Sequence, residues 1–159
     1  MQGVRLGLGT ILWLLGALYV SVAPWLFPPR PLPPAPGEWS YVIRHEHYVF
    51  SLAAASLFFA ALYFFLETAL RLPLRRWLKL IHFGAMFLGV NLILLPTQIL
   101  RLGGLPKGGS DPIPFFELCN AISSAGYLIT LAGLGVFVLL LIDATWRQIR
   151  PSHLTPVAP

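Results

Sequence analysis

The stretch "RHEHYVFSLAAASLFFAALYFF", residues 44–65, sets two histidines at the start of an almost entirely apolar segment. From Tyr48 to Phe65 this segment carries no charged side chain. A helix of about 20 apolar residues is long enough to cross the hydrocarbon core of a bilayer. The stretch therefore predicts a membrane-spanning helix that begins with a histidine pair.

The composition of the whole chain extends this prediction. Its 159 residues are 57% hydrophobic and 11% charged, whereas a soluble domain carries about 25% charged residues. A signal peptide ending after Ser21-Val22-Ala23 is an alternative for the first apolar segment, but Pro24 follows at the cut and only Arg5 precedes the segment. Because helices satisfy their own backbone in lipid, we expect an all-α membrane protein with a single four-helix transmembrane domain over residues 1–159. Its expected helices cover about residues 6–27, 41–70, 78–100 and 115–142.

Basic residues predict how the chain crosses the membrane. Four spans put both termini on one side, and that side holds seven basic residues against four on the other. The positive-inside rule then places both termini, with the tail 147–159, in the cytoplasm. The net charge of +5 belongs to these flanks and not to a nucleic-acid-binding face. The inner set is Arg5, Arg71, Arg75, Arg76, Lys79, Arg147 and Arg150, and the outer set is Arg30, Arg44, Arg101 and Lys107.

The connections between the spans differ in character. Residues 24–40 are rich in proline and form an extended outer loop, and residues 101–114 form an outer loop rich in glycine and proline. The inner connection, residues 71–77, is short. It predicts that the second and third helices pack as antiparallel neighbours.

The spacing of His45 and His47 indicates their chemistry. Two residues along an α-helix turn the side chain by about 200°, so the two imidazoles belong to opposite faces and cannot bind one small metal ion together. Each imidazole suits an axial position on haem iron, because a flat porphyrin fits between packed helices. The alternative is a histidine pair at the water–membrane interface, since Arg44 and Glu46 lie beside it.

Several stretches, in order, resemble the C-terminal third of haem–copper oxidase (cytochrome c oxidase) subunit I, helices nine to twelve. "HEHYVFSLAAASLFFA" (45–60) is similar to the tenth helix, where a His-x-His motif carries one axial ligand for each of two haems. "IHFGAMFLGVNLILLP" (81–96) resembles the eleventh helix, and "LGGLPKGGSD" (102–111) resembles the loop after it. "NAISSAGYLITLAG" (120–133) resembles the twelfth, and "GTILWLLGALYV" (9–20) fits the ninth more loosely. The resemblance implies one arc of the subunit I fold in a respiratory membrane, the prokaryotic cytoplasmic membrane or its equivalent.

The resemblance also implies roles for single residues. His45 matches the axial ligand of the high-spin haem, and His47 matches that of the low-spin haem. Lys107 falls where the family has an arginine pair that clamps the haem propionates, and Arg44 and Arg101 lie on the same membrane side. The haem type stays open, with b-type favoured if the chain assembles with itself.

Other family sites are missing from this chain. Glu38 stands where the family has an aspartate at a magnesium site, but Gly37 replaces the neighbouring histidine, so we expect no magnesium site. His82 matches a family histidine that is not a metal ligand, and His153 lies in the tail. We therefore expect no copper within this chain and no oxygen reduction by the chain alone.

Three arrangements fit these residues. In the favoured one, the chain is an electron-transfer cytochrome that forms a homo-oligomer, with a trimer favoured, and haem lies between His45 of one protomer and His47 of the next. Alternatively, the chain is the C-terminal fragment of a split subunit I, and another polypeptide supplies the N-terminal part of a cytochrome c oxidase. The third interpretation is a non-haem accessory or assembly subunit. All three place the chain in a lipid bilayer, and none involves nucleic acid.

Overall fold

The computed structural model describes residues 6–26, 45–103 and 113–149, with the side chains of residues 6–23, 50–96 and 117–149. Every regular element in these residues is a helix, which confirms the predicted all-α class. A π-helical turn, η1 (Phe65–Ala69), continues the second helix. The four α-helices are α1 (Leu8–Leu26), α2 (His45–Phe64), α3 (Arg76–Gly103) and α4 (Ile113–Ile149).

The apolar surface of these helices suits a bilayer. The stretches 50–69, 76–96 and 117–149 are long and apolar enough to cross a membrane, and residues 8–23 form a shorter apolar helix. In the most apolar part of each of these three stretches, taken in the same order, only 28%, 22% and 17% is buried inside the bundle. Most apolar side chains therefore face outward, where lipid rather than water is the solvent in which they are stable.

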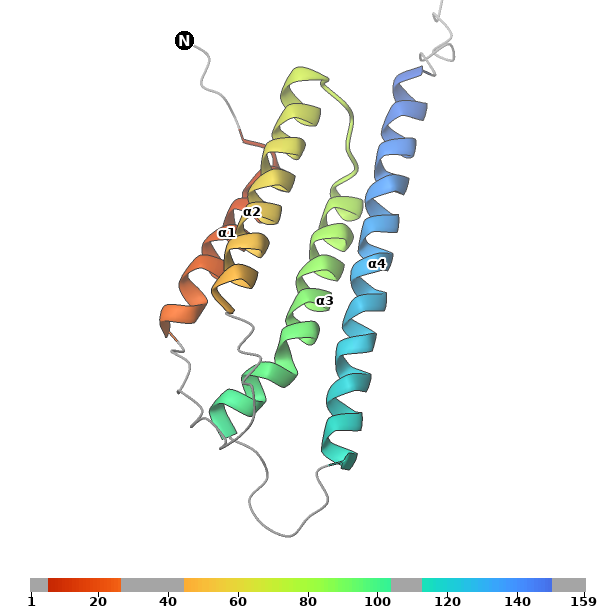
Figure 1. The fold of residues 1–159 in the computed structure, drawn as a ribbon. Helices are drawn as coiled ribbons and strands as arrows, with labels where there is room; N and C mark the ends of the chain where they lie inside the picture. Colours follow the sequence, from red (N-terminus) through yellow and green to blue (C-terminus); the bar gives the residue numbers. More distant parts are fainter. Residues whose placement is uncertain (1–5, 27–44, 104–112, 150–159) are drawn as a thin grey trace, which may run out of the picture.

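The helices associate as two antiparallel pairs (Figure 1). α1 packs along α2, α3 packs along α4, and α1 also touches α3. Within the described residues no Cα atoms of α2 and α3 come within 8 Å of each other. The two helices are therefore antiparallel neighbours, as predicted, but they meet through long side chains and not through a close approach of their backbones. Long aromatic side chains fill the space between the pairs: Phe59 of α2 lies edge-on to His82 of α3, with ring centroids 5.0 Å apart.

Glycines allow α3 and α4 to approach closely. A methyl group on Gly126 of α4 would lie 2.7 Å from the carbonyl oxygen of Gly89 in α3, and one on Gly89 would meet the Gly126 carbonyl at 2.8 Å. Small residues at such crossings are a common basis of helix association in membranes, because lipid tails are as apolar as leucine and close packing must hold the helices together.

The ends of the helices differ from the expected bounds. α3 begins at Arg76, before the expected start at 78, and α4 continues to Ile149, beyond the expected end at 142. The 37 residues of α4 make a rod of about 55 Å, longer than the hydrocarbon core of about 30 Å. An untilted α4 therefore extends beyond the bilayer core, and near its C-terminal end an ion pair between Asp143 and Arg147, one turn apart, supports the helix.

The turn after α2 is shaped by a left-handed residue. Arg71 has a φ of 50°, a conformation in which the chain leaves the helix direction. The backbone N–H of Leu72 then donates to the carbonyl oxygen of Leu66 at 2.9 Å, which closes the end of η1. The chain turns back from there into α3.

Candidate functional site

The first turn of α2 holds the histidine pair, because the helix begins at His45. The side chains of His45 and His47 lie outside the described side chains, but the helix backbone gives the register of both positions. Positions 52, 56, 59 and 63 repeat the register of position 45, since each lies close to a whole number of 3.6-residue turns further on. Leu52 is half-buried, whereas Ser56, Phe59 and Tyr63 are buried. Position 45 thus shares the face that α2 turns towards the bundle.

Position 47 belongs to another face of α2. The same spacing from 47 leads to Ala54, Phe58, Ala61 and Phe65, and all four are exposed. Phe58 and Phe65 expose 63% and 51% of their surface. The register of position 47 therefore runs along an apolar face that no described helix of this chain covers.

A narrow crevice lies beside the face that shares the register of position 45. Its volume is about 70 Å³, and Leu52, Ala55, Ser56 and Phe59 form its α2 wall. Side chains of α1 and α3 close the other walls: Trp13, Gly16, Val20, Phe83, Met86, Phe87, Val90 and Asn91. Pockets for cofactors and small molecules usually measure about 300–1,000 Å³. In this single chain the crevice is thus a packing gap and not a cofactor pocket.

The other predicted haem contacts fall mostly outside the described residues. Arg44 and Lys107 are not among them, and Arg101 lies on the described backbone of α3 without a described side chain. The loop with Glu38 and the tail with His153 also lie outside. Contact of these cations with haem propionates therefore stays a prediction.

The described polar site lies nearer the opposite end of α2. The hydroxyl of Tyr63 and Nδ1 of His82 share a hydrogen bond of 2.9 Å, and both side chains are fully buried. The ring of Trp13 in α1 lies 5.2 Å from the His82 ring, and the ring of Phe137 in α4 lies 5.0 Å from it. His82 is thus the point at which all four helices meet.

A nearly buried ion pair lies one turn from this hydrogen bond. Lys79 Nζ donates to Glu67 Oε1 at 2.6 Å, and the two side chains keep only 10% and 14% exposure. The backbone immediately before α1 closes over the pair, because a methyl group on Gly7 would collide with Glu67 Oε2. Ionisable groups inside a membrane bundle are costly unless they pair, so this contact restricts how α1, η1 and α3 pack together.

Some polar atoms around these two contacts are buried without a hydrogen-bond partner among the described residues. They are Thr10 Oγ1, Trp13 Nε1, Glu67 Oε2 and His82 Nε2. No group of three histidine, cysteine, aspartate or glutamate side chains capable of holding a metal ion occurs among the described side chains.

Sequence reasoning treated His82 as a non-ligand and counted Lys79 among the inner basic residues, and it connected neither of them with Tyr63 or Glu67. A signal for all four was present, because Tyr63 and Glu67 are four residues apart and Lys79 and His82 are three apart. Residues at these spacings lie on one side of a helix. Two polar pairs in apolar segments, facing each other across a short connection, predict a buried contact.

Comparison with known proteins identifies the family relationship. Over 103 residues, or 65% of this chain, the sequence is 36% identical to cytochrome c oxidase subunit 1 of Eremothecium gossypii. Over 108 residues, or 68% of the chain, it is 34% identical to the subunit of the same name from Albinaria turrita. Over 110 residues, or 69% of the chain, it is 32% identical to that of Cereibacter sphaeroides. The chain is related to cytochrome c oxidase subunit 1. With its apolar helices, this relationship makes it an integral membrane protein.

The relationship covers only part of the relatives. The matched region spans 19% of the Eremothecium and Cereibacter cytochrome c oxidase subunits and 55% of the Albinaria sequence. No family model matches the chain, and no solved structure matches it significantly. The resemblance to subunit I that the motifs predicted is thus confirmed, over a length consistent with the C-terminal part of that subunit.

Proposed function

We propose that the chain is a haem-binding membrane cytochrome that transfers electrons. The observation that carries the proposal is the position of the His-x-His motif in a relative of cytochrome c oxidase subunit 1. The motif opens α2, and its two positions belong to different faces of that helix. A helix that offers one imidazole to each side suits two separate haem sites.

The face in register with position 47 fits a haem better than the face in register with position 45. A porphyrin is a flat apolar ring, and the exposed row from Ala54 to Phe65 offers a matching apolar surface. The crevice of about 70 Å³ beside the other face is too small for a macrocycle. Haem on His45 would therefore lie outside this crevice, beyond the helix turn of Leu52, where another copy of the chain could enclose it.

The favoured arrangement is a homo-oligomer, with a trimer as its simplest closed form. Each interface then holds one haem between His45 of one protomer and His47 of the next, with Lys107, Arg44 and Arg101 near the propionates. If His45 and His47 held the iron together, they would leave no open position for oxygen, and the group would supply electron transfer. The side chains hold and orient the ring, and the apolar helix faces exclude water from it.

A second candidate is a fragment of a split oxidase. The observation that favours it is the length of the match, since the matched region covers only 19% of two relatives. A second polypeptide would then supply the earlier helices, with the copper-site histidines and the missing axial ligand. In either case the basic flanks favour an orientation with both termini in the cytoplasm.

The deciding experiment is a reduced-minus-oxidised absorption spectrum of the protein expressed and purified alone, with haem and chain quantified. The self-assembled cytochrome predicts about one haem per chain and a sharp low-spin spectrum that carbon monoxide does not alter. Folded protein without haem would reject this proposal. Recovery of haem only upon co-expression with a chain that holds the copper-site histidines would establish the split oxidase, and absence of haem in both preparations would favour an accessory subunit.

A further inference from the structure

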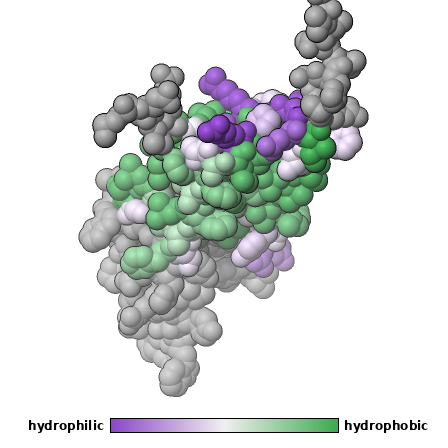
Figure 2. All heavy atoms as spheres, turned by 90° about the horizontal axis from the view of Figure 1, so that it is seen from above, coloured by the Kyte–Doolittle hydropathy of each residue, from purple (hydrophilic) through white to green (hydrophobic). Residues whose placement is uncertain are grey.

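One end of the bundle gathers most of the charge of the described helices. We call it the basic end, and it comprises η1, the connection to α3, the first turn of α3 and the last turns of α4. It carries five basic and two acidic side chains, a net charge of +3. Figure 2 looks onto this end and shows hydrophilic side chains gathered above an apolar body. The residues are Arg71, Arg75, Arg76, Lys79 and Arg147, with Glu67 and Asp143.

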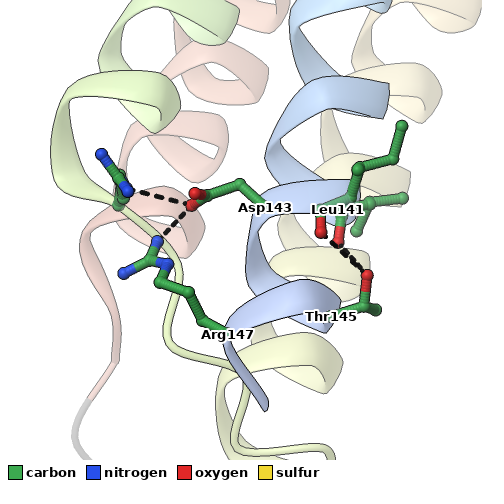
Figure 3. Close-up of polar contacts among 6 residues, drawn as sticks. Leu141, Asp143, Thr145 and Arg147 are labelled. Carbon is green, nitrogen blue, oxygen red and sulfur yellow. Dashed lines mark hydrogen bonds and ion pairs between the residues drawn. The ribbon is translucent and has the colours of Figure 1, made fainter. Parts of the chain in front are cut away.

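Pairing within the basic end leaves a positive surplus. Lys79 forms an ion pair with Glu67, which balances both charges. Asp143 accepts from two arginines, with Arg75 Nε at 3.1 Å and Arg147 from the next turn of α4 (Figure 3). Arg71 and Arg76 are exposed and make no ion pair with another described residue. The surplus charge thus lies on exposed arginines at the surface of the bundle.

An open groove begins beside this charge. It lies between α3 and α4, has a volume of about 480 Å³, and is lined by Trp77, Leu78, Leu139, Ile142, Asp143 and Trp146. Trp77 and Trp146 expose 52% and 57% of their surface. Indole rings at the end of an apolar span are typical of the membrane–water boundary, where one edge meets lipid tails and the other meets headgroups.

We propose that this groove binds an anionic phospholipid. The phosphate lies against Arg71 and Arg76, and an acyl chain follows the groove past Leu139 and Ile142. Charge complementarity favours this occupant, because a zwitterionic lipid would leave the surplus of the basic end unbalanced. The paired arginines cancel the charge of Asp143, so the carboxylate does not repel the phosphate. Basic pockets between helices on the cytoplasmic side of a membrane are typical sites for anionic headgroups. The proposal does not depend on haem binding.

The test uses tryptophan quenching in reconstituted bilayers. The full chain is placed in phosphatidylcholine containing either brominated phosphatidylglycerol or brominated phosphatidylcholine, and the ratio of their quenching gives the relative affinity. We expect phosphatidylglycerol to be favoured. Replacing Arg71 and Arg76 together by glutamine should weaken this preference by about fivefold per arginine. Arg30→Gln removes one positive charge from the loop predicted on the opposite side and should leave the preference unchanged, whereas each of the single variants Arg71→Gln and Arg76→Gln should weaken it.

A second variant pair locates the lipid. Replacing both Trp77 and Trp146 by phenylalanine should abolish the phosphatidylglycerol-specific part of the quenching. Equal quenching by both lipids, or a preference that survives in either double variant, would overturn the proposal, as would a cross-linked second copy of the chain covering the groove. If the arginine variant loses its helical circular dichroism, the proposal is tested on the unmodified protein instead. The preference of the unmodified protein for phosphatidylglycerol must then fall as ionic strength rises, because exposed charges are screened by salt.

Discussion

Two rows of side chains along α2 repeat at the same spacing and lie in opposite surroundings. Leu52, Ser56, Phe59 and Tyr63 follow the register of position 45 and turn into the bundle, with Phe59 at 9% exposure and Tyr63 at 0%. The row that follows the register of position 47 is exposed along its whole length and consists of Ala54, Phe58, Ala61 and Phe65. The two histidines look equivalent in the sequence, but each stands at the start of a row of side chains with different surroundings.

Hydrophobicity alone does not distinguish the two rows, because both are mainly apolar. In water a helix buries its apolar side, but lipid tails are as apolar as leucine, so apolar area alone does not select a buried face. Polar partners and close packing select it instead. Tyr63 finds His82, and Phe59 stacks on Trp13 with ring centroids 4.6 Å apart.

The largest expected effect concerns the histidines themselves. In the self-assembled cytochrome each haem takes one ligand from each face, so His45→Ala and His47→Ala should each remove nearly all bound haem. His153→Ala, in the tail, is the matched control and should retain haem. The measurement is haem per chain by absorption after purification. If haem is lost in His47→Ala but not in His45→Ala, His45 is not a ligand and the proposed ligation by both histidines is wrong.

Substitution of adjacent phenylalanines on the two faces compares burial directly. Phe59→Ala should destabilise the protein by about 3–5 kcal/mol, since it opens a cavity beside Trp13 and His82. Phe58→Ala removes a ring that no described helix of the same chain covers, so in the haem-free single chain it should change stability by no more than about 0.5 kcal/mol. Unfolding in mixed micelles, followed by circular dichroism, measures both. Losses of similar size in the assembled protein would indicate that haem or another copy covers the Phe58 face, as the proposed homo-oligomer requires.

Breaking the ion pair beyond the end of α2 should cost somewhat less. Lys79→Met leaves the carboxylate of Glu67 buried without its partner and should destabilise the bundle by about 3 kcal/mol. Combining it with Glu67→Gln removes the stranded charge and should restore much of the loss. The same unfolding assay compares the single and double variants. A double variant as unstable as Lys79→Met would indicate that packing of the lysine chain, and not charge, matters.

The smallest effect tests the hydrogen bond between α2 and α3. Tyr63→Phe keeps the buried ring but leaves Nδ1 of His82 without its partner, which should cost about 1–3 kcal/mol. Tyr127 of α4 is 63% exposed, so Tyr127→Phe is the control and should be close to neutral. Thermal unfolding in detergent separates the two variants. A neutral Tyr63→Phe would mean that the ring contacts alone position His82.

The sequence by itself determined the class, the four apolar helices and the relationship to subunit 1. These follow from local properties, because a span needs about 20 apolar residues in a row and the His-x-His motif with its neighbouring stretches is a linear pattern. The opposite registers of positions 45 and 47 also follow from helix geometry alone. The bounds of α4 did not, since the helix continues to Ile149, beyond the uninterrupted apolar run that ends at Ile142, with an ion pair between Asp143 and Arg147 in this last part.

Only the tertiary structure decided which faces are buried and which helices pair. The short connection predicted that α2 and α3 are neighbours, and their side chains do meet. The close backbone contacts, however, are those of α1 with α2 and of the glycines of α3 and α4. The site around Tyr63, Glu67, Lys79 and His82 joins the two helix pairs. The spacing within each segment marks a polar side, but only the structure shows that these two sides meet. In a bilayer, where every apolar face is tolerated, the few polar contacts and the fit of small residues select the arrangement.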